Sequence, residues 1–222
     1  MESTGKNSGS TAGVTGVILA GGLSSRMGSN KALLPYQGGR FIEAIHRQLS
    51  ELFSEVILVT NSAEQYAFLP CRKVIDIYPG MGALGGLHAG LHHSASPYIF
   101  AVACDMPYLN SPLIRTIVSS RKGVDVVIPE GDKGQEPLHA LYGRNCLRPM
   151  EQALQSGKRR IVSFFPEVRV CSLPREAVTA VDPAFDSFRN INTPTDYYQL
   201  REDERGSSHA ASRPSSIRAL QR

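Results

Sequence analysis

The chain has 222 residues, 41% of them hydrophobic, which is enough to bury a core of its own. Its formal net charge of +4 is mild, and we see no basic stretch interleaved with aromatic residues, which argues against a nucleic-acid groove. No apolar stretch is long enough to span a bilayer, and the Ser/Gly-rich N-terminus lacks the apolar segment of a signal peptide. We therefore expect a cytoplasmic protein that binds neither membranes nor nucleic acid.

Polar termini bound the folded part of the chain. Residues 1–13 are rich in Ser and Gly, and residues 201–222 are charged and rich in Ser. Both segments lack the apolar residues that ordered chain buries, so we expect them to be disordered. The predicted domain spans residues 14–200.

Within that span, short apolar runs alternate with helical patterns. Buried strands are predicted at 13–20, 55–60, 71–75, 97–104 and 124–129, where the runs are continuous and rich in β-branched residues. Helices are predicted at 41–53, 83–95 and 110–123, the last with Ser111 as N-cap. This alternation predicts a single α/β domain of three layers, α/β/α, with a mostly parallel, Rossmann-like sheet.

Chemistry-bearing residues follow several of these strands. A glycine-rich loop with two cations begins after residue 20, Asn61 and Asp76 follow the next two strands, and Asp105 follows the run 97–104. In open α/β sheets, ligands bind beyond the carboxyl ends of the strands. We therefore expect these residues to converge on one edge of the sheet.

The loop after the first strand has the composition of a phosphate-binding loop. Gly21 and Gly22 allow the backbone to approach a ligand closely, and Arg26 and Lys31 supply positive charge for phosphate oxygens. The spacing is neither GxGxxG nor that of a P-loop, and the glycines alone would fit an ordinary turn. The cations at these offsets favour phosphate binding.

Asp105 is the natural partner of this loop. An isolated Asp at this position would most often cap the following turn. Opposite a phosphate-binding loop, however, a carboxylate is better suited to hold Mg²⁺, which binds through one or two carboxylates together with substrate phosphates. We therefore predict that Asp105 is a magnesium ligand.

Four stretches together resemble the molybdenum cofactor guanylyltransferases of the MobA type. They are LAGGLSSRMGSNKALL from residue 19, DIYPGMGALGGLHAGL from residue 76, VACDMPYLNSPLI from residue 102 and FRNINTPTDYYQL from residue 188. The second stretch has Ala83 where the family has proline. The resemblance implies the nucleotide-diphospho-sugar transferase type of fold for a nucleotidyltransferase domain at 14–200.

The resemblance also implies roles for individual residues. The guanine would contact the backbone of Leu19, Ala20 and Gly21, with Asn61 lining the base pocket. The remaining residues would surround the phosphates (Gly22, Arg26, Gly28, Lys31), lie near the nucleotide (Asp76), bind Mg²⁺ (Asp105) or face the pterin (Asn190, Asn192). Arg26, Lys31 and Asp105 would be the catalytic residues.

The implied reaction transfers GMP from GTP to the terminal phosphate of molybdopterin, forming the guanine dinucleotide cofactor and releasing pyrophosphate. Partners would be GTP, molybdopterin and, beyond them, cofactor-inserting proteins and molybdoenzymes. Three alternatives stay open: a cytidylyltransferase on the same pterin, a sugar-phosphate nucleotidyltransferase, and a non-catalytic carrier of a nucleotide or cofactor. The cytidylyl relatives usually have Ala where this chain has Gly21.

Two further features could bind metal or phosphate. His88 and His92 have the i, i+4 spacing of zinc ligands, but no third ligand is evident in the sequence, so we expect a packed or solvated helix face. The basic run at 157–160 fits a substrate phosphate and a solvated helix end equally well. The four cysteines have no CxxC spacing and are expected to be free thiols.

Overall fold

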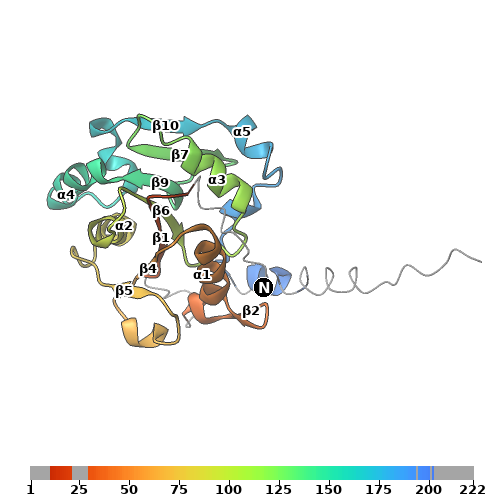
Figure 1. Cartoon of the computed structure of the whole chain (residues 1–222). Helices are drawn as coiled ribbons and strands as arrows, with labels where there is room; N and C mark the ends of the chain where they lie inside the picture. The colour runs from red at the N-terminus through yellow and green to blue at the C-terminus, as the bar shows by residue number, and fades with distance from the viewer. Residues whose placement is uncertain (1–10, 22–29, 194, 201, 203–222) are drawn as a thin grey trace, which may run out of the picture.

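A central sheet of eight strands organises the chain, of which the structure, a computed structural model, describes residues 11–21, 30–193, 195–200 and 202. The strand order is β10-β7-β9-β6-β1-β4-β5, with β8 paired to β7 (Figure 1). The strands of this sheet are β1 (Val14–Leu19), β4 (Val56–Val59), β5 (Arg72–Val74), β6 (Tyr98–Ala103), β7 (Val126–Gly131), β8 (Gly134–Gln135), β9 (His139–Gly143) and β10 (Val170–Leu173). A separate antiparallel pair consists of β2 (Pro35–Tyr36) and β3 (Gly39–Arg40).

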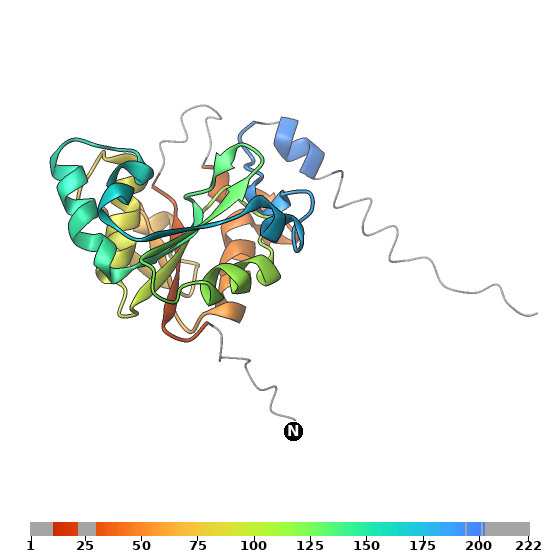
Figure 2. The ribbon, with the colours of Figure 1, turned by 90° about the horizontal axis from the view of Figure 1, so that it is seen from above.

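Helices cover both faces of the sheet, as Figure 2 shows. On one face lie α1 (Phe41–Leu52), α3 (Ser111–Ser119) and α5 (Arg175–Thr179), and on the other lie α2 (Gly82–His93) and α4 (Leu147–Gln155). Short 3-10 helices join the larger elements: η1 (Lys31–Leu33), η2 (Ala63–Tyr66), η3 (Arg144–Cys146), η4 (Ile161–Glu167) and η5 (Asp186–Phe188).

The alternation of side chains along the strands explains the three layers. Successive residues of a strand point to opposite faces, so in β1 Ile18 packs into the core beneath α1 and α3, whereas Val17 and Leu19 pack beneath α2 and α4. All six residues of β1 are buried, which is why its sequence is apolar apart from Thr15 and shows no polar alternation. The predicted α/β/α architecture is confirmed.

Strand directions match the predicted, mostly parallel sheet, with two antiparallel exceptions, β9 near the middle and the short β8, which pairs with β7. β1 pairs in parallel with both β4 and β6, β4 with β5, and β10 with β7. β9 runs antiparallel to β6 and to β7. The sequence does not reveal β10 or α4, because the segments after residue 129 lack a long β-branched run.

Glycines in α2 allow this helix to lie very close to the sheet. A Cβ added at Gly90 would lie 2.6 Å from Cγ1 of Val17, closer than side chains can approach. A Cβ at Gly86 would already touch Leu19 at 3.5 Å. The unusual glycine content of this helix is therefore a packing requirement of the α2–β1 contact.

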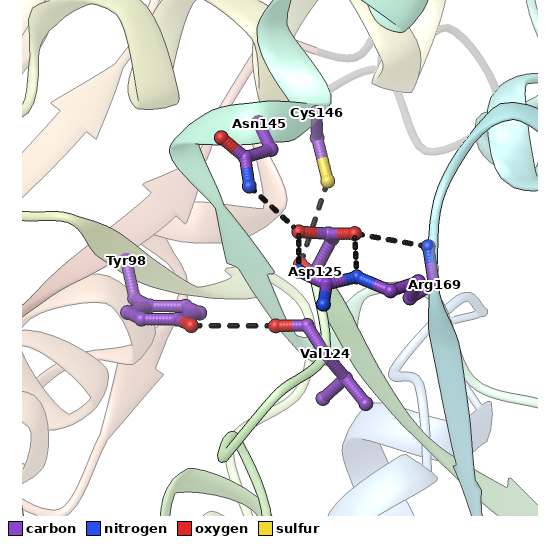
Figure 3. A network of polar contacts seen from close by, with 6 residues as sticks. All are labelled: Tyr98, Val124, Asp125, Asn145, Cys146 and Arg169. Atoms are coloured by element: carbon purple, nitrogen blue, oxygen red, sulfur yellow. Dashed lines mark hydrogen bonds and ion pairs between the residues drawn. The ribbon is translucent and has the colours of Figure 1, made fainter.

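A polar network ties β10 to the outer half of the sheet (Figure 3). Asp125 accepts hydrogen bonds from the backbone N and Nε of Arg169, both at 3.0 Å, and from Nδ2 of Asn145 at 2.9 Å. The side-chain hydrogen bond from Arg169 holds the pKa of Asp125 well below its usual range. The buried carboxylate is therefore charged and fully paired, as a buried ion must be.

Several sequence expectations about the ends of elements differ from the structure. The N-cap of α3 is Asn110 rather than Ser111: its Oδ1 accepts a hydrogen bond from Leu113 N at 2.9 Å, and Ser111 is already helical. Thr11, inside the segment expected to be disordered, is buried and donates to the Leu52 carbonyl oxygen at 2.6 Å. Residues 1–10 and nearly all of 201–222 lie outside the described residues.

All four cysteines are free thiols, as predicted. Among the described helices, none is both long and apolar enough to cross a membrane.

Candidate functional site

The carboxyl ends of β1, β4 and β6 lie side by side and bring the predicted site residues to one edge of the sheet. Immediately after β1, the Ala20 amide donates to the Val59 carbonyl oxygen of β4 at 2.9 Å. On the other side of β1, the Cys104 amide donates to the Leu19 carbonyl oxygen at 3.2 Å. Gly21, Asn61 and Asp105 are thus the residues at which three neighbouring strands open into loops.

Asn61 and Asp76 form a reciprocal pair at this edge. The side-chain amide of Asn61 donates from Nδ2 to Oδ2 of Asp76, and its Oδ1 accepts from the Asp76 backbone N, both at 3.2 Å. These two hydrogen bonds fix the Asp76 carboxylate relative to the end of β4. The sequence predicted both residues at the edge, and the structure shows them in direct contact.

The second oxygen of the Asp76 carboxylate is buried and has no hydrogen-bond partner among the described residues. Glycines lie beside both oxygens of this carboxylate: a Cβ at Gly86 would lie 3.6 Å from the unpaired Oδ1, and a Cβ at Gly21 would lie 3.8 Å from Oδ2. Burial raises the pKa of Asp76 above its ordinary value, against the opposing hydrogen bond from Asn61. An acceptor that is desolvated and unpaired costs free energy, which a ligand with N–H donors would recover.

Asp105 is half-buried at the end of β6 and lies against the C-terminal segment of the domain. Its backbone carbonyl oxygen accepts a hydrogen bond from the Ile191 amide at 2.9 Å. Asn190 and Asn192 flank Ile191 and are exposed, so the structure brings both to the loop of Asp105. Residues separated by more than 80 positions in the sequence therefore share one site.

The segment that carries Asn192 is held in place by a helix cap. Asp196 accepts hydrogen bonds from the backbone N of Asn192 at 2.9 Å and of Thr193 at 2.8 Å, while the Asp196 backbone N donates to Oγ1 of Thr193 at 3.1 Å. This is a capping box at the start of the helix that begins at residue 195. The Thr-x-x-Asp spacing is visible in the sequence and could have identified Asp196 as a positioning residue.

Most of the predicted phosphate-binding loop lies outside the described residues, namely Gly22, Arg26 and Gly28. Lys31 begins η1, but its side chain is not described. The loop's C-terminal end is anchored by Asn30, whose Nδ2 donates to Oε1 of Gln65 at 3.0 Å and to the Tyr66 hydroxyl at 2.8 Å. Asn30, which was not among the predicted site residues, therefore fixes the backbone just before Lys31 relative to η2.

A cleft of about 340 Å³ begins two residues beyond Asp105. Its walls are Tyr36, Gln37, Gln48, Pro107, Tyr108, Leu109, Asn110, Asp182, Asp186 and Ser187. None of the predicted site residues lines it. We therefore place the candidate site at the carboxyl edge of the sheet, where the predicted residues meet, and not in this cleft.

Comparison with known proteins identifies the family of the chain. The family profile of the MobA-like NTP transferase domain matches residues 16–170. A probable molybdenum cofactor guanylyltransferase of Pelotomaculum thermopropionicum is 38% identical over 84% of this chain and 91% of its own length. A molybdenum cofactor guanylyltransferase of Desulfosudis oleivorans is 37% identical over 81% of this chain and 90% of its own length.

A solved structure of a related protein has the same fold. The molybdopterin-guanine dinucleotide biosynthesis protein A of Archaeoglobus fulgidus superposes with a TM-score of 0.74 at 27% identity. The superposition covers 88% of this chain and 99% of that protein. The resemblance seen in the sequence is confirmed, and the chain belongs to the family of MobA-like NTP transferases, as a nucleotidyltransferase enzyme.

Proposed function

We propose that the chain transfers GMP from GTP to the terminal phosphate of molybdopterin. An oxygen of that phosphate attacks the α-phosphorus of GTP, a new P–O bond forms, the bond to the β-phosphate breaks, and pyrophosphate leaves. The observation that carries this proposal is the meeting of Asp76, Asp105 and Asn190–Asn192 at one edge of the sheet, in a chain whose relatives bear this activity in their names. Those names favour guanylyl transfer over the cytidylyl, sugar-phosphate and carrier alternatives.

Base selection would come from the end of β1 together with Asp76. The Watson–Crick edge of guanine carries two adjacent donors, N1–H and the 2-amino group, whereas cytosine and adenine each offer one amino group there. A carboxylate held by Asn61 and with one oxygen unpaired among the described residues suits the two donors of guanine. The backbone of Leu19, Ala20 and Gly21 would complete the base pocket, and Gly21 has no side chain to obstruct it.

Phosphate alignment would fall to the loop after β1. Gly22, Arg26, Gly28 and Lys31 would surround the triphosphate, and the two cations would offset the charge that develops as pyrophosphate leaves. Little covalent chemistry is required of the protein in such a reaction, because alignment and charge neutralisation supply most of the rate. Asn30 supports this role because its two hydrogen bonds fix the loop end that carries Lys31.

The chemistry of the donor set fits a divalent cation at Asp105. A half-buried carboxylate at a strand end, beside a triphosphate, is an oxygen ligand of the kind that Mg²⁺ prefers. Bound there, Mg²⁺ would supply charge stabilisation to the transferring phosphoryl group. The pterin would meet Asn190 and Asn192, which the hydrogen bond from Ile191 to Asp105 holds at this edge. Cofactor-inserting proteins, molybdoenzymes and a cytoplasmic location remain expectations.

Nucleotide binding and pyrophosphate release test the assignment. We expect calorimetry to show tighter binding of GTP than of ITP, which lacks the 2-amino group, and tighter binding of both than of CTP. Replacing Asp76 by Asn should weaken GTP binding by about 10- to 100-fold, the value of one charge-assisted hydrogen bond, and narrow the preference over CTP. Equal affinity of the native chain for GTP and CTP, or equal pyrophosphate release from both with molybdopterin as acceptor, would refute guanylyl transfer.

A further inference from the structure

Three potential metal ligands gather between α2 and α4, on the helical layer behind the sheet. Nitrogen or oxygen atoms of His88, His92 and Glu151 all lie within 4.8 Å of one another. The two helices lie side by side in both views of the ribbon (Figures 1 and 2). The third ligand that the sequence did not reveal therefore comes from α4, 63 positions beyond His88.

One pair of these ligand atoms already has the spacing found in a tetrahedral site. Nε2 of His88 lies 3.2 Å from Oε1 of Glu151. In a tetrahedral zinc site with metal–ligand bonds of about 2.0–2.1 Å, two ligand atoms lie about 3.3 Å apart. His92 is exposed, and its side chain is thus free to rotate toward the other two. Little movement separates the observed arrangement from a three-ligand site.

The environment of His88 suits a metal ligand better than a surface histidine. The residue is 1% exposed, and the ring of Tyr78 packs edge-on against it with centroids 5.1 Å apart. Burial lowers the pKa of His88, although the neighbouring Glu151 acts in the opposite direction. Its Nδ1 is buried without a partner among the described residues, so no neighbour there fixes the tautomer.

A hydrogen bond would by itself explain the 3.2 Å contact between His88 and Glu151. It does not account for the second histidine, His92, that lies beside this pair. The i, i+4 spacing places His92 on the same face of α2, and its ring centroid lies 5.8 Å from that of His88. Glu151 is 39% exposed, so a hydrated ion could enter from the side of His92 and Glu151. A water molecule can then fill the fourth coordination position of such an ion.

We propose that His88, His92 and Glu151 bind a divalent transition metal, with zinc the best fit, and that the ion joins α2 to α4. Two imidazoles and a carboxylate with an open fourth position form a known type of zinc site. Imidazole nitrogens select zinc, nickel or copper over Mg²⁺, which takes oxygen ligands. His88 lies about 9 Å and His92 about 15 Å along the helix from its start at Gly82, so this site is separate from the nucleotide edge.

Zinc titration of the full chain, free of affinity tags and stripped with a chelator, tests the proposal. In the presence of millimolar Mg²⁺ we expect one equivalent of Zn²⁺ to bind by calorimetry and to raise the melting temperature, since an ion that binds only the folded chain stabilises it. The variants His92→Ala and Glu151→Gln should each lose at least tenfold in affinity. Both leave His88 unchanged, because removing a buried side chain would also disturb the packing.

The matched control is His93→Ala, which removes the next imidazole of the same helix but none of the three ligands. It should bind Zn²⁺ like the native chain. Co²⁺ gives a second readout, because its visible spectrum intensifies in a tetrahedral site and should do so in the native chain and the control only. Absence of stoichiometric binding, unchanged affinity in His92→Ala and Glu151→Gln, or loss of binding in Asp105→Asn instead would each overturn the proposal.

Discussion

Lowering the pH should reduce the free energy of unfolding, because one histidine of the sheet is buried. His139, the first residue of β9, is 0% exposed, and the rings of Phe100 and Phe188 lie edge-on to it at centroid distances of 5.1 and 5.3 Å. Neither ring nitrogen has a hydrogen-bond partner among the described residues. Burial lowers the pKa of His139 from 6.5 to about 3, although the Asp182 carboxylate acts in the opposite direction.

The sign of the effect follows from proton binding. Between the unfolded pKa of 6.5 and the folded pKa of about 3, the unfolded chain binds a proton at His139 that the folded chain does not. The free energy of unfolding therefore falls as the pH drops below 6.5. At pH 5, which is 1.5 units below the unfolded pKa, the loss from this residue is about 2 kcal/mol, at about 1.36 kcal/mol per unit.

Urea unfolding of the native chain and of His139→Leu measures this loss. Leu keeps an apolar side chain between the two phenylalanines and removes the titration. We expect the native chain to lose about 2 kcal/mol more than the variant between about pH 7.5 and pH 5. Other histidines titrate equally in both proteins, and any packing change in the variant cancels in the difference between the two pH values. Parallel loss in both proteins would show that His139 takes up a proton in the folded state, which would refute the reasoning.

Three further predictions concern the site and its support. Asp105→Asn should lower the rate of guanylyl transfer by about 100-fold or more at ordinary Mg²⁺ concentrations. The melting temperature should change little, since the two side chains are nearly isosteric. A near-native turnover rate would exclude Asp105 as a metal ligand. Lys31→Ala should raise the dissociation constant of GTP and lower turnover while the melting temperature stays the same; a lower melting temperature with unchanged kinetics would make Lys31 structural. Gly90→Ala should lower the free energy of unfolding in urea by about 1–3 kcal/mol, because the added Cβ would lie 2.6 Å from Val17. The better helix propensity of Ala acts in the opposite direction but is smaller. Equal or greater stability of the variant would contradict the close α2–β1 contact.

The first half of the fold was predictable from the sequence because its strands are buried on both faces. Val17, Ile18 and Leu19 belong to a continuous apolar run, and such a run between turn signals identifies a central strand of a parallel sheet. The direction of β9 was not predictable in the same way. Its five residues include His139 and Gly143, and nothing in a run that short encodes its direction. The antiparallel return follows from pairing with β6, which is a tertiary property.

In the candidate site, too, the positions of the residues along the chain were predictable, whereas their contacts with one another were not. Asn61, Asp76 and Asp105 could each be predicted because each follows a strand, and strand ends converge at one edge. Their contacts could not, because the pairing of Asn61 with Asp76 depends on the relative twist and register of β4 and β5. Glu151 could not be predicted as the third metal ligand for the same reason, because its proximity to His88 depends on how α4 packs on α2.

The hydrogen bond between the Ile191 amide and the Asp105 carbonyl oxygen joins the two halves of the site in the function that we propose. Asp105 belongs to the first half of the site, which we assign to the nucleotide, and Ile191 lies between the two asparagines that we assign to the pterin. Holding two reactants in the right geometry turns a bimolecular step into an effectively unimolecular one. Because the bond joins two backbones, no side-chain substitution at Asp105 removes it. A variant that disrupts the cap at Asp196, which holds the same segment through Asn192 and Thr193, should therefore raise the KM for molybdopterin while leaving the affinity for GTP unchanged.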